Sequence, residues 1–116
     1  MIAAVSLTLI ADAGAQTKGP NGGIVMKADD HPIEFVVRNQ EIVFYVGDHD
    51  GKPMPTKGVK ARAVVQSGGK TTTITLAPAA PNMLVGKLAA PLGAKARVVF
   101  SSAFEGHSLQ ARFVAP

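Results

Sequence analysis

The chain of 116 residues contains no cysteine and no tryptophan, and aromatic residues make up only 5% of it. Without cysteine it can form no cysteine nucleophile, no cysteine-ligated zinc site and no iron–sulfur cluster. It also has no apolar run long enough to span a membrane, so we expect no membrane span in the mature chain. Valine, alanine, threonine and glycine dominate the rest, a composition that favours strands over long helices.

The sequence patterns of common enzyme classes are missing as well. Ser101, Ser102 and Ser108 lie near His107, but no Gly-x-Ser-x-Gly elbow surrounds them. The glycine-rich segments have neither the Walker nor the dinucleotide-binding spacing. No pair of carboxylates falls on one inward strand face, as a glycosidase would need. We therefore expect a protein that is not an enzyme and that uses no organic cofactor.

The chain carries 12 basic and 8 acidic residues, for a formal net charge of +4. Such a balance raises the question of a nucleic-acid partner. The basic residues, however, are scattered along strands and loops with no aromatic residues between them to stack bases. We interpret them as a solvated basic face and expect no nucleic-acid partner.

Residues 1–15, MIAAVSLTLIADAGA, are an apolar run followed by small residues. Ala13-Gly14-Ala15 fits an A-x-A cleavage site, which is typical of a secretory signal peptide. No lysine or arginine precedes the run and Asp12 lies near its end, which fits a signal truncated at its start. The alternative is that residues 1–15 form a strand or helix of the fold. We expect a signal peptide at 1–15, a linker at 16–18, one domain at 19–116 and export to the periplasm.

The stretch from 31 to 51, HPIEFVVRNQEIVFYVGDHDG, predicts a β-hairpin because apolar and polar residues alternate in both halves. A two-residue turn at Asn39-Gln40 places the apolar residues on one face of the hairpin. The pairs expected in this register are Arg38 with Glu41, Val37 with Ile42, Phe35 with Phe44 and Ile33 with Val46. Extended past Pro32 and Gly47, the same register places His31 opposite Asp48 and Asp30 opposite His49.

In the rest of the chain, short predicted strands also alternate with turns. A second hairpin around Gly68-Gly69 should pair Val65 with Thr72 and Ala63 with Ile74. Further strands are expected at 24–27, 83–88, 96–102 and 108–114, with loops at 48–58 and 77–82. About seven to eight short antiparallel strands without a helical period predict an all-β, immunoglobulin-like β-sandwich. The alternative is a small barrel.

Strands that alternate in direction would bring the three histidines to one end of this fold. The candidate metal ligands are His31, His49, His107 and Asp48. Imidazole with a carboxylate suits Zn, Cu or Ni, and the thioether of Met54 would shift the preference toward Cu(I). We expect one such ion, with Asp48 as the fourth ligand or as a group that orients the histidines. Alternatively, these are ordinary turn residues, and Asp48 and Asp50 bind their own backbone.

Several short features of the chain carry a resemblance to a known family. They are Gly19-Pro20-Asn21-Gly22-Gly23, the strand containing Glu34, Tyr45, the Asp50-Gly51-Lys52-Pro53 turn and Glu105-Gly106-His107. In these features, residues 19–116 resemble the N-terminal periplasmic domain of the adaptor (membrane-fusion) subunits of cobalt–zinc–cadmium type RND heavy-metal efflux systems, or a small stand-alone exported relative of that domain. The resemblance implies a β-sandwich, a periplasmic location and metal binding through histidines.

The helical hairpin, the lipoyl-like part and the barrel of such adaptors have no counterpart in the sequence. The role implied by the resemblance is therefore metal capture, handover or sensing, with a metal ion and an efflux-system protein as partners. The alternative is an interaction module without a metal of its own, which docks on an efflux or envelope protein through a sheet face or edge.

Overall fold

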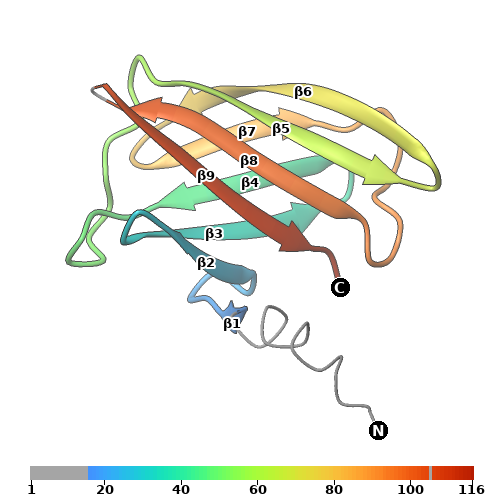
Figure 1. Ribbon diagram of the computed structural model, residues 1–116, viewed down its shortest axis with the longest axis horizontal. Helices are drawn as coiled ribbons and strands as arrows, with labels where there is room; N and C mark the ends of the chain where they lie inside the picture. Colours follow the sequence, from blue (N-terminus) through green and yellow to red (C-terminus); the bar gives the residue numbers. More distant parts are fainter. Residues whose placement is uncertain (1–15, 105) are drawn as a thin grey trace, which may run out of the picture.

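The computed structural model describes residues 16–104 and 106–116, which contain nine strands and no helix. Their bounds are β1 (Thr17–Lys18), β2 (Ile24–Ala28), β3 (His31–Arg38), β4 (Glu41–Val46), β5 (Lys60–Ser67), β6 (Lys70–Ala79), β7 (Met83–Lys87), β8 (Arg97–Phe104) and β9 (His107–Val114). All neighbours pair antiparallel, in the order β1-β2-β3-β4-β7-β6-β5-β8-β9 (Figure 1). The expected signal peptide at 1–15 lies outside the described residues.

The nine strands form one curled sheet that resembles half of a barrel, and β2 packs against β9 across its interior (Figure 1). The all-β antiparallel class predicted from sequence is confirmed. The immunoglobulin-like sandwich of seven to eight strands is not confirmed, because a sandwich needs two separate sheets. Here β7 pairs with β4 on one side and with β6 on the other, so it joins the two halves into a single sheet.

Two segments expected as linker or loop belong to strands. Thr17 and Lys18 pair with β2 and form β1, although residues 16–18 were expected as a linker. The loop expected at 77–82 begins late, because β6 continues to Ala79 and pairs there with β7. Pro78 is tolerated because the β5 ladder already ends at Leu76, so the missing N–H of the proline breaks no bond.

The registers predicted for both hairpins are confirmed. In β3–β4, Phe35 lies opposite Phe44 and Ile33 opposite Val46. In β5–β6, Ala63 lies opposite Ile74, and the turn residues Gly68 and Gly69 have φ angles of 59° and 80°. Two positive φ angles in a two-residue loop define a type I′ turn, which fixes the register of its strands.

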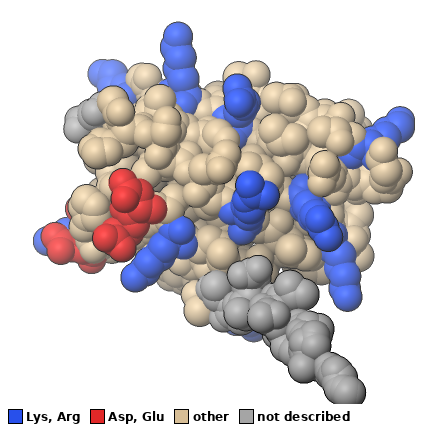
Figure 2. Space-filling model, viewed as in Figure 1, with Lys and Arg blue, Asp and Glu red and all other residues tan. Residues whose placement is uncertain are grey.

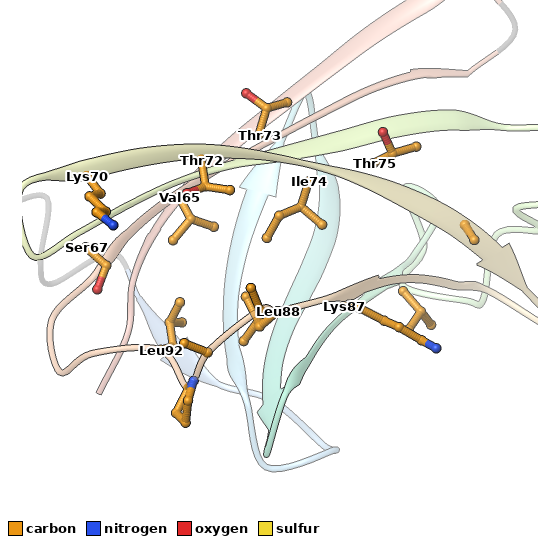
Figure 3. A pocket seen from close by; sticks show the side chains of 15 residues that line it. Val65, Ser67, Lys70, Thr72, Thr73, Ile74, Thr75, Lys87, Leu88 and Leu92 are labelled. Carbon is orange, nitrogen blue, oxygen red and sulfur yellow. The ribbon is translucent and has the colours of Figure 1, made fainter.

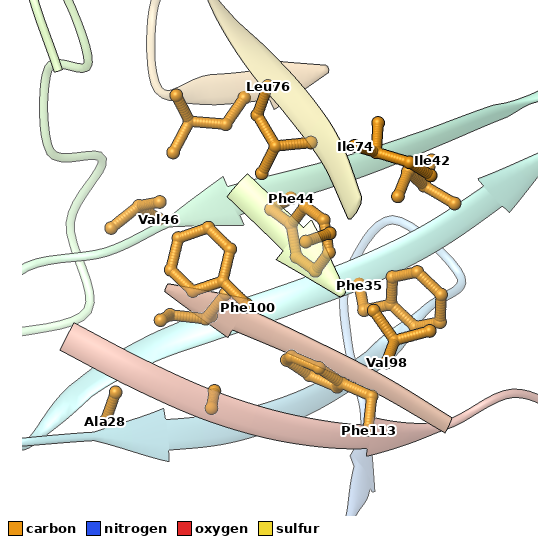
Figure 4. Packing of buried hydrophobic residues seen from close by; sticks show 14 of the residues in the cluster. Ala28, Phe35, Ile42, Phe44, Val46, Ile74, Leu76, Val98, Phe100 and Phe113 are labelled. Atoms are coloured by element: carbon orange, nitrogen blue, oxygen red, sulfur yellow. The ribbon is translucent and has the colours of Figure 1, made fainter. Parts of the chain in front are cut away.

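Four of the five phenylalanines meet at the centre of the core (Figure 4). The ring of Phe44 lies 5.3 Å from that of Phe35, 4.8 Å from that of Phe100 and 5.8 Å from that of Phe113, measured between centroids. These rings come from β3, β4, β8 and β9, so they hold the two halves of the curled sheet together. All four side chains are buried.

Two valines of β3 depart from the simple alternation of buried and exposed residues. Val37 shares the face of Phe35 but is 37% exposed, because β2 accompanies β3 only as far as Phe35. Val36, on the opposite face, is only 7% exposed. It is covered by the chain at Gly23, where an added Cβ would lie 2.7 Å from a methyl of Val36. Val36 is therefore buried although it lies on the face opposite to the core residues of β3.

We predict that three substitutions in this hairpin differ in their cost to the free energy of unfolding. Phe44→Ala should cost about 3–5 kcal/mol, because it opens a cavity among the four rings. Val36→Ala should cost about 1.5 kcal/mol, the transfer free energy of two buried methylene-sized groups. Val37→Ala should cost less than about 0.5 kcal/mol. Urea unfolding measures all three, and equal costs for Val36→Ala and Val37→Ala would contradict this account of the outer face.

Ser102 lies on the inner face of β8 and is 7% exposed, and within the described chain its Oγ has no hydrogen-bond partner. A buried polar atom without a partner lowers stability by its desolvation cost. Ser102→Ala should therefore raise the free energy of unfolding by about 1 kcal/mol. The matched control is Ser101→Ala on the opposite face, which should change it little. A loss of stability in Ser102→Ala would show that the hydroxyl is satisfied.

Candidate functional site

Two of the three histidines lie side by side at the open end of the β3–β4 hairpin. His31 begins β3, and His49 lies in the loop after β4. Their imidazole rings are 4.4 Å apart between centroids and tilted by 43°. We call these two residues the histidine pair.

The hairpin register continues to Gly47, one residue past the end of β4, and the loop that carries His49 therefore starts close to β3. The N–H of Gly47 donates to the carbonyl of Pro32 at 2.8 Å, and Gly47 forms an isolated bridge with Pro53. Any Cβ at position 47 would lie 2.8 Å from Cγ of Pro32. Glycine is needed here because the loop must cross the proline ring closely before it turns back.

The backbone holds the ring of His31 in one orientation. Its Nδ1 lies 3.0 Å from the carbonyl oxygen of Gly47. A carbonyl oxygen only accepts hydrogen bonds, so Nδ1 carries the proton and donates it. In the neutral ring, Nε2 then keeps a free lone pair. Histidines that bind metals commonly donate their other ring N–H to a backbone carbonyl in this way.

Asp48 builds the turn that carries His49. Its Oδ1 accepts hydrogen bonds from the N–H of Asp50 at 2.8 Å and from the N–H of Lys52 at 2.9 Å. The Lys52 N–H, ahead of the Asp50 N–H, holds the pKa of Asp48 below its ordinary value. Asp48 thus binds its own backbone, as the alternative interpretation expected. The group that orients His31 is the carbonyl of Gly47 rather than the carboxylate of Asp48.

The structure does not bring the other predicted groups into the pair. His107 is exposed at the start of β9, where it lies opposite Phe104. The β8–β9 hairpin does end on the same side of the molecule as the β2–β3 turn (Figure 1). Met54 is half-buried and packs against the core. Among residues 16–104 and 106–116, no group of three or more histidine, aspartate or glutamate side chains is arranged to hold a metal ion.

Acidic residues lie next to the histidine pair in the sequence. Asp29 and Asp30 form the β2–β3 turn, and Asp48 and Asp50 lie in the loop after β4. Figure 2 shows the acidic side chains gathered at one end of the viewed face, while lysine and arginine are spread over it. A local excess of carboxylates lowers the electrostatic potential and so attracts cations.

Glu34 is the residue whose role the sequence did not reveal. It lies on the outer face of β3 yet is only 4% exposed. Its carboxylate accepts hydrogen bonds from the N–H of Asn21 at 2.9 Å, from Nδ2 of Asn21 at 2.8 Å and from the N–H of Gly23 at 2.8 Å. The loop at 19–23 therefore folds over Glu34. The dense glycine turn directly before β2 is the signal that could have suggested such a close approach.

No family model, curated protein or solved structure matches the chain. The described residues include no helix that is both long and apolar enough to cross a membrane. The resemblance to the efflux-adaptor domain therefore stays a prediction.

We predict that Glu34→Ala releases the 19–23 loop from the sheet. Three hydrogen bonds to a charged group are lost and two backbone N–H groups lose their acceptor, so the free energy of unfolding should fall by about 2–4 kcal/mol. Faster amide hydrogen exchange at Asn21 and Gly23 would report the release. The control is Glu41→Ala, a half-buried glutamate at the start of β4. Unchanged exchange at both amides in Glu34→Ala would contradict the prediction.

Proposed function

We propose that this protein is a periplasmic module that binds a transition-metal ion in heavy-metal efflux or resistance, with His31 and His49 as its protein ligands. The observation that carries the proposal is the 4.4 Å separation of the two rings, together with the hydrogen bond that leaves Nε2 of His31 free. Imidazole nitrogen is a good ligand for Zn, Cu and Ni. The aspartates that neighbour the pair in the two loops favour a bound cation.

The incomplete ligand set favours capture and handover over permanent storage. Structural zinc sites have four protein ligands, whereas two histidines leave two positions open. His49 is exposed, so solvent or the ligands of a partner protein can fill these positions. An ion held in this way can pass to a partner without first leaving for bulk solvent.

The location and the pathway in this proposal come from the family resemblance. The features that carry it include the 19–23 turn, Glu34 and the Asp50–Pro53 turn. In this structure the first two are bonded to each other, and the third forms the loop that holds His49. Each feature thus has a structural role in this chain, and the proposed relation to a periplasmic efflux domain rests on the resemblance in sequence.

Calorimetry with Zn(II), Cu(I), Cu(II) and Ni(II) on the full chain tests this proposal. At least one ion should bind with a dissociation constant below about 0.1 mM. His31→Ala and His49→Ala should each weaken binding by at least about tenfold, because each removes half of the protein ligands. Binding weaker than this limit for all four ions, or unchanged affinity in the double variant, would refute the proposal.

The control variant in this experiment is His107→Ala. The exposed position of His107 predicts unchanged affinity, because the ion is held by the histidine pair alone. A tenfold loss in His107→Ala would instead show that three histidines bind the ion, as the sequence had predicted.

A further inference from the structure

Part of β6 has an unpaired edge on the side that faces β7. These strands pair only at Ala77 with Val85, Pro78 with Leu84 and Ala79 with Met83. The preceding part of β6, residues 70–76, pairs with β5 on one side. On its other side, no strand of the described chain pairs with it.

The type I′ turn determines which backbone groups face this open edge. Ser67 and Lys70 flank the turn, so they exchange both hydrogen bonds, and pairing then recurs at every second residue. Thr72, Ile74 and Leu76 therefore bond to β5. The N–H and C=O groups of Thr71, Thr73 and Thr75 point away from β5, toward the open edge. This row of groups can accept another strand.

An apolar groove of about 780 Å³ lies along this edge, which we call the β6 groove. Figure 3 shows Val65 and Ile74 pointing into it from the β5–β6 side, and Leu88 and Leu92 from the segment that follows β7. That segment is held in place, because the N–H of Leu88 donates to the carbonyl of Gln40 at 2.7 Å. The groove thus combines a backbone edge with an apolar floor.

The charge of the groove has one sign. Lys70 and Lys87 lie at its opposite ends (Figure 3), and no aspartate or glutamate lines it. A ligand with apolar side chains in its middle and a carboxylate at each end would complement this arrangement.

We propose that the β6 groove binds an extended segment of a partner protein, which adds a strand to the edge of β6. The free edge, residues 71–75, suits a segment of about five residues, or roughly 17 Å of strand. Alternate side chains of the segment fill the apolar floor, and acidic residues at its ends pair with Lys70 and Lys87. Backbone bonds supply affinity and the alternating side chains supply specificity in such strand additions.

This site is independent of the histidine pair. The β5–β6 turn lies at the opposite end of the sheet from the β2–β3 turn, which precedes His31 (Figure 1). Both sites can therefore be occupied at once, and a failure at one leaves the other unaffected.

The test uses a synthetic, end-blocked peptide in which valine and threonine alternate between two terminal aspartates. Amide hydrogen exchange, followed by NMR on the full chain, should show protection appearing at Thr71, Thr73 and Thr75 when the peptide is added. Thr72 and Ile74 already donate to β5, so their exchange should change little. The same peptide with lysine in place of both aspartates should bind at least about tenfold more weakly.

Two sets of variants separate strand addition from simple filling of the groove. Thr73→Pro removes one outward N–H without touching the β5 ladder and should weaken binding by about tenfold, while Thr73→Ala, which keeps the N–H, should bind normally. A double variant with Lys70→Glu and Lys87→Glu should instead prefer the lysine-ended peptide. This charge-reversal arm remains informative even if Thr73→Pro fails to fold.

Three outcomes would overturn the proposal. The first is binding with no new protection at the three outward amides, which would mean that the groove takes apolar groups without strand addition. The second is equal affinity for the aspartate-ended and lysine-ended peptides. The third is protection of the same amides that rises with protein concentration in the absence of peptide, which would identify a second copy of the chain as the occupant.

Discussion

The buried carboxylate of Glu34 is the interaction on which the first third of the sheet depends. A charged group on the outer face of a strand would normally be solvated, and its burial is acceptable only because Asn21 and Gly23 donate three hydrogen bonds to it. The loop held in this way covers Val36 and leads directly into β2. Gln16, just before β1, accepts a hydrogen bond from the N–H of Val114 in β9. The same N-terminal segment therefore links the two ends of the curled sheet.

The sequence predicted the hairpins well because their information is local. Alternation with a period of two and a two-residue turn determine the register of β3–β4, and this register together with the turn at Asp48 brings His49 beside His31. Asp48, which was predicted as a fourth ligand or orienting group, is also explained locally, because its carboxylate binds the backbone of its own turn. His107 comes from the far half of the sheet, and its distance from the pair depends on how the sheet curls. No pattern within one hairpin contains that information.

The sequence predicted a sandwich of two sheets and not the single sheet of the structure, for a similar reason. A glycine inside a strand generally weakens it, but an added Cβ at Gly86 in β7 would lie 2.7 Å from side-chain atoms of both Ile74 and Leu76. The glycine leaves room for these two β6 side chains to pack over β7, next to the ladder that joins the halves. From sequence, a glycine that weakens a strand and one that permits a close approach look the same.

The joining strand β7 also has a consequence for local unfolding. It has only five residues, and it connects β1-β2-β3-β4 on one side to β6-β5-β8-β9 on the other. Each of these halves contains hairpins between consecutive strands, which form from contacts that are close in sequence. The β4–β7 ladder joins residues about forty positions apart, so its formation costs more loop-closure entropy. Opening of β7 would break the ladder between the halves but not the packed rings of the shared core, so we expect the β4–β7 ladder to form after the local hairpins and to add to a connection that the core already makes.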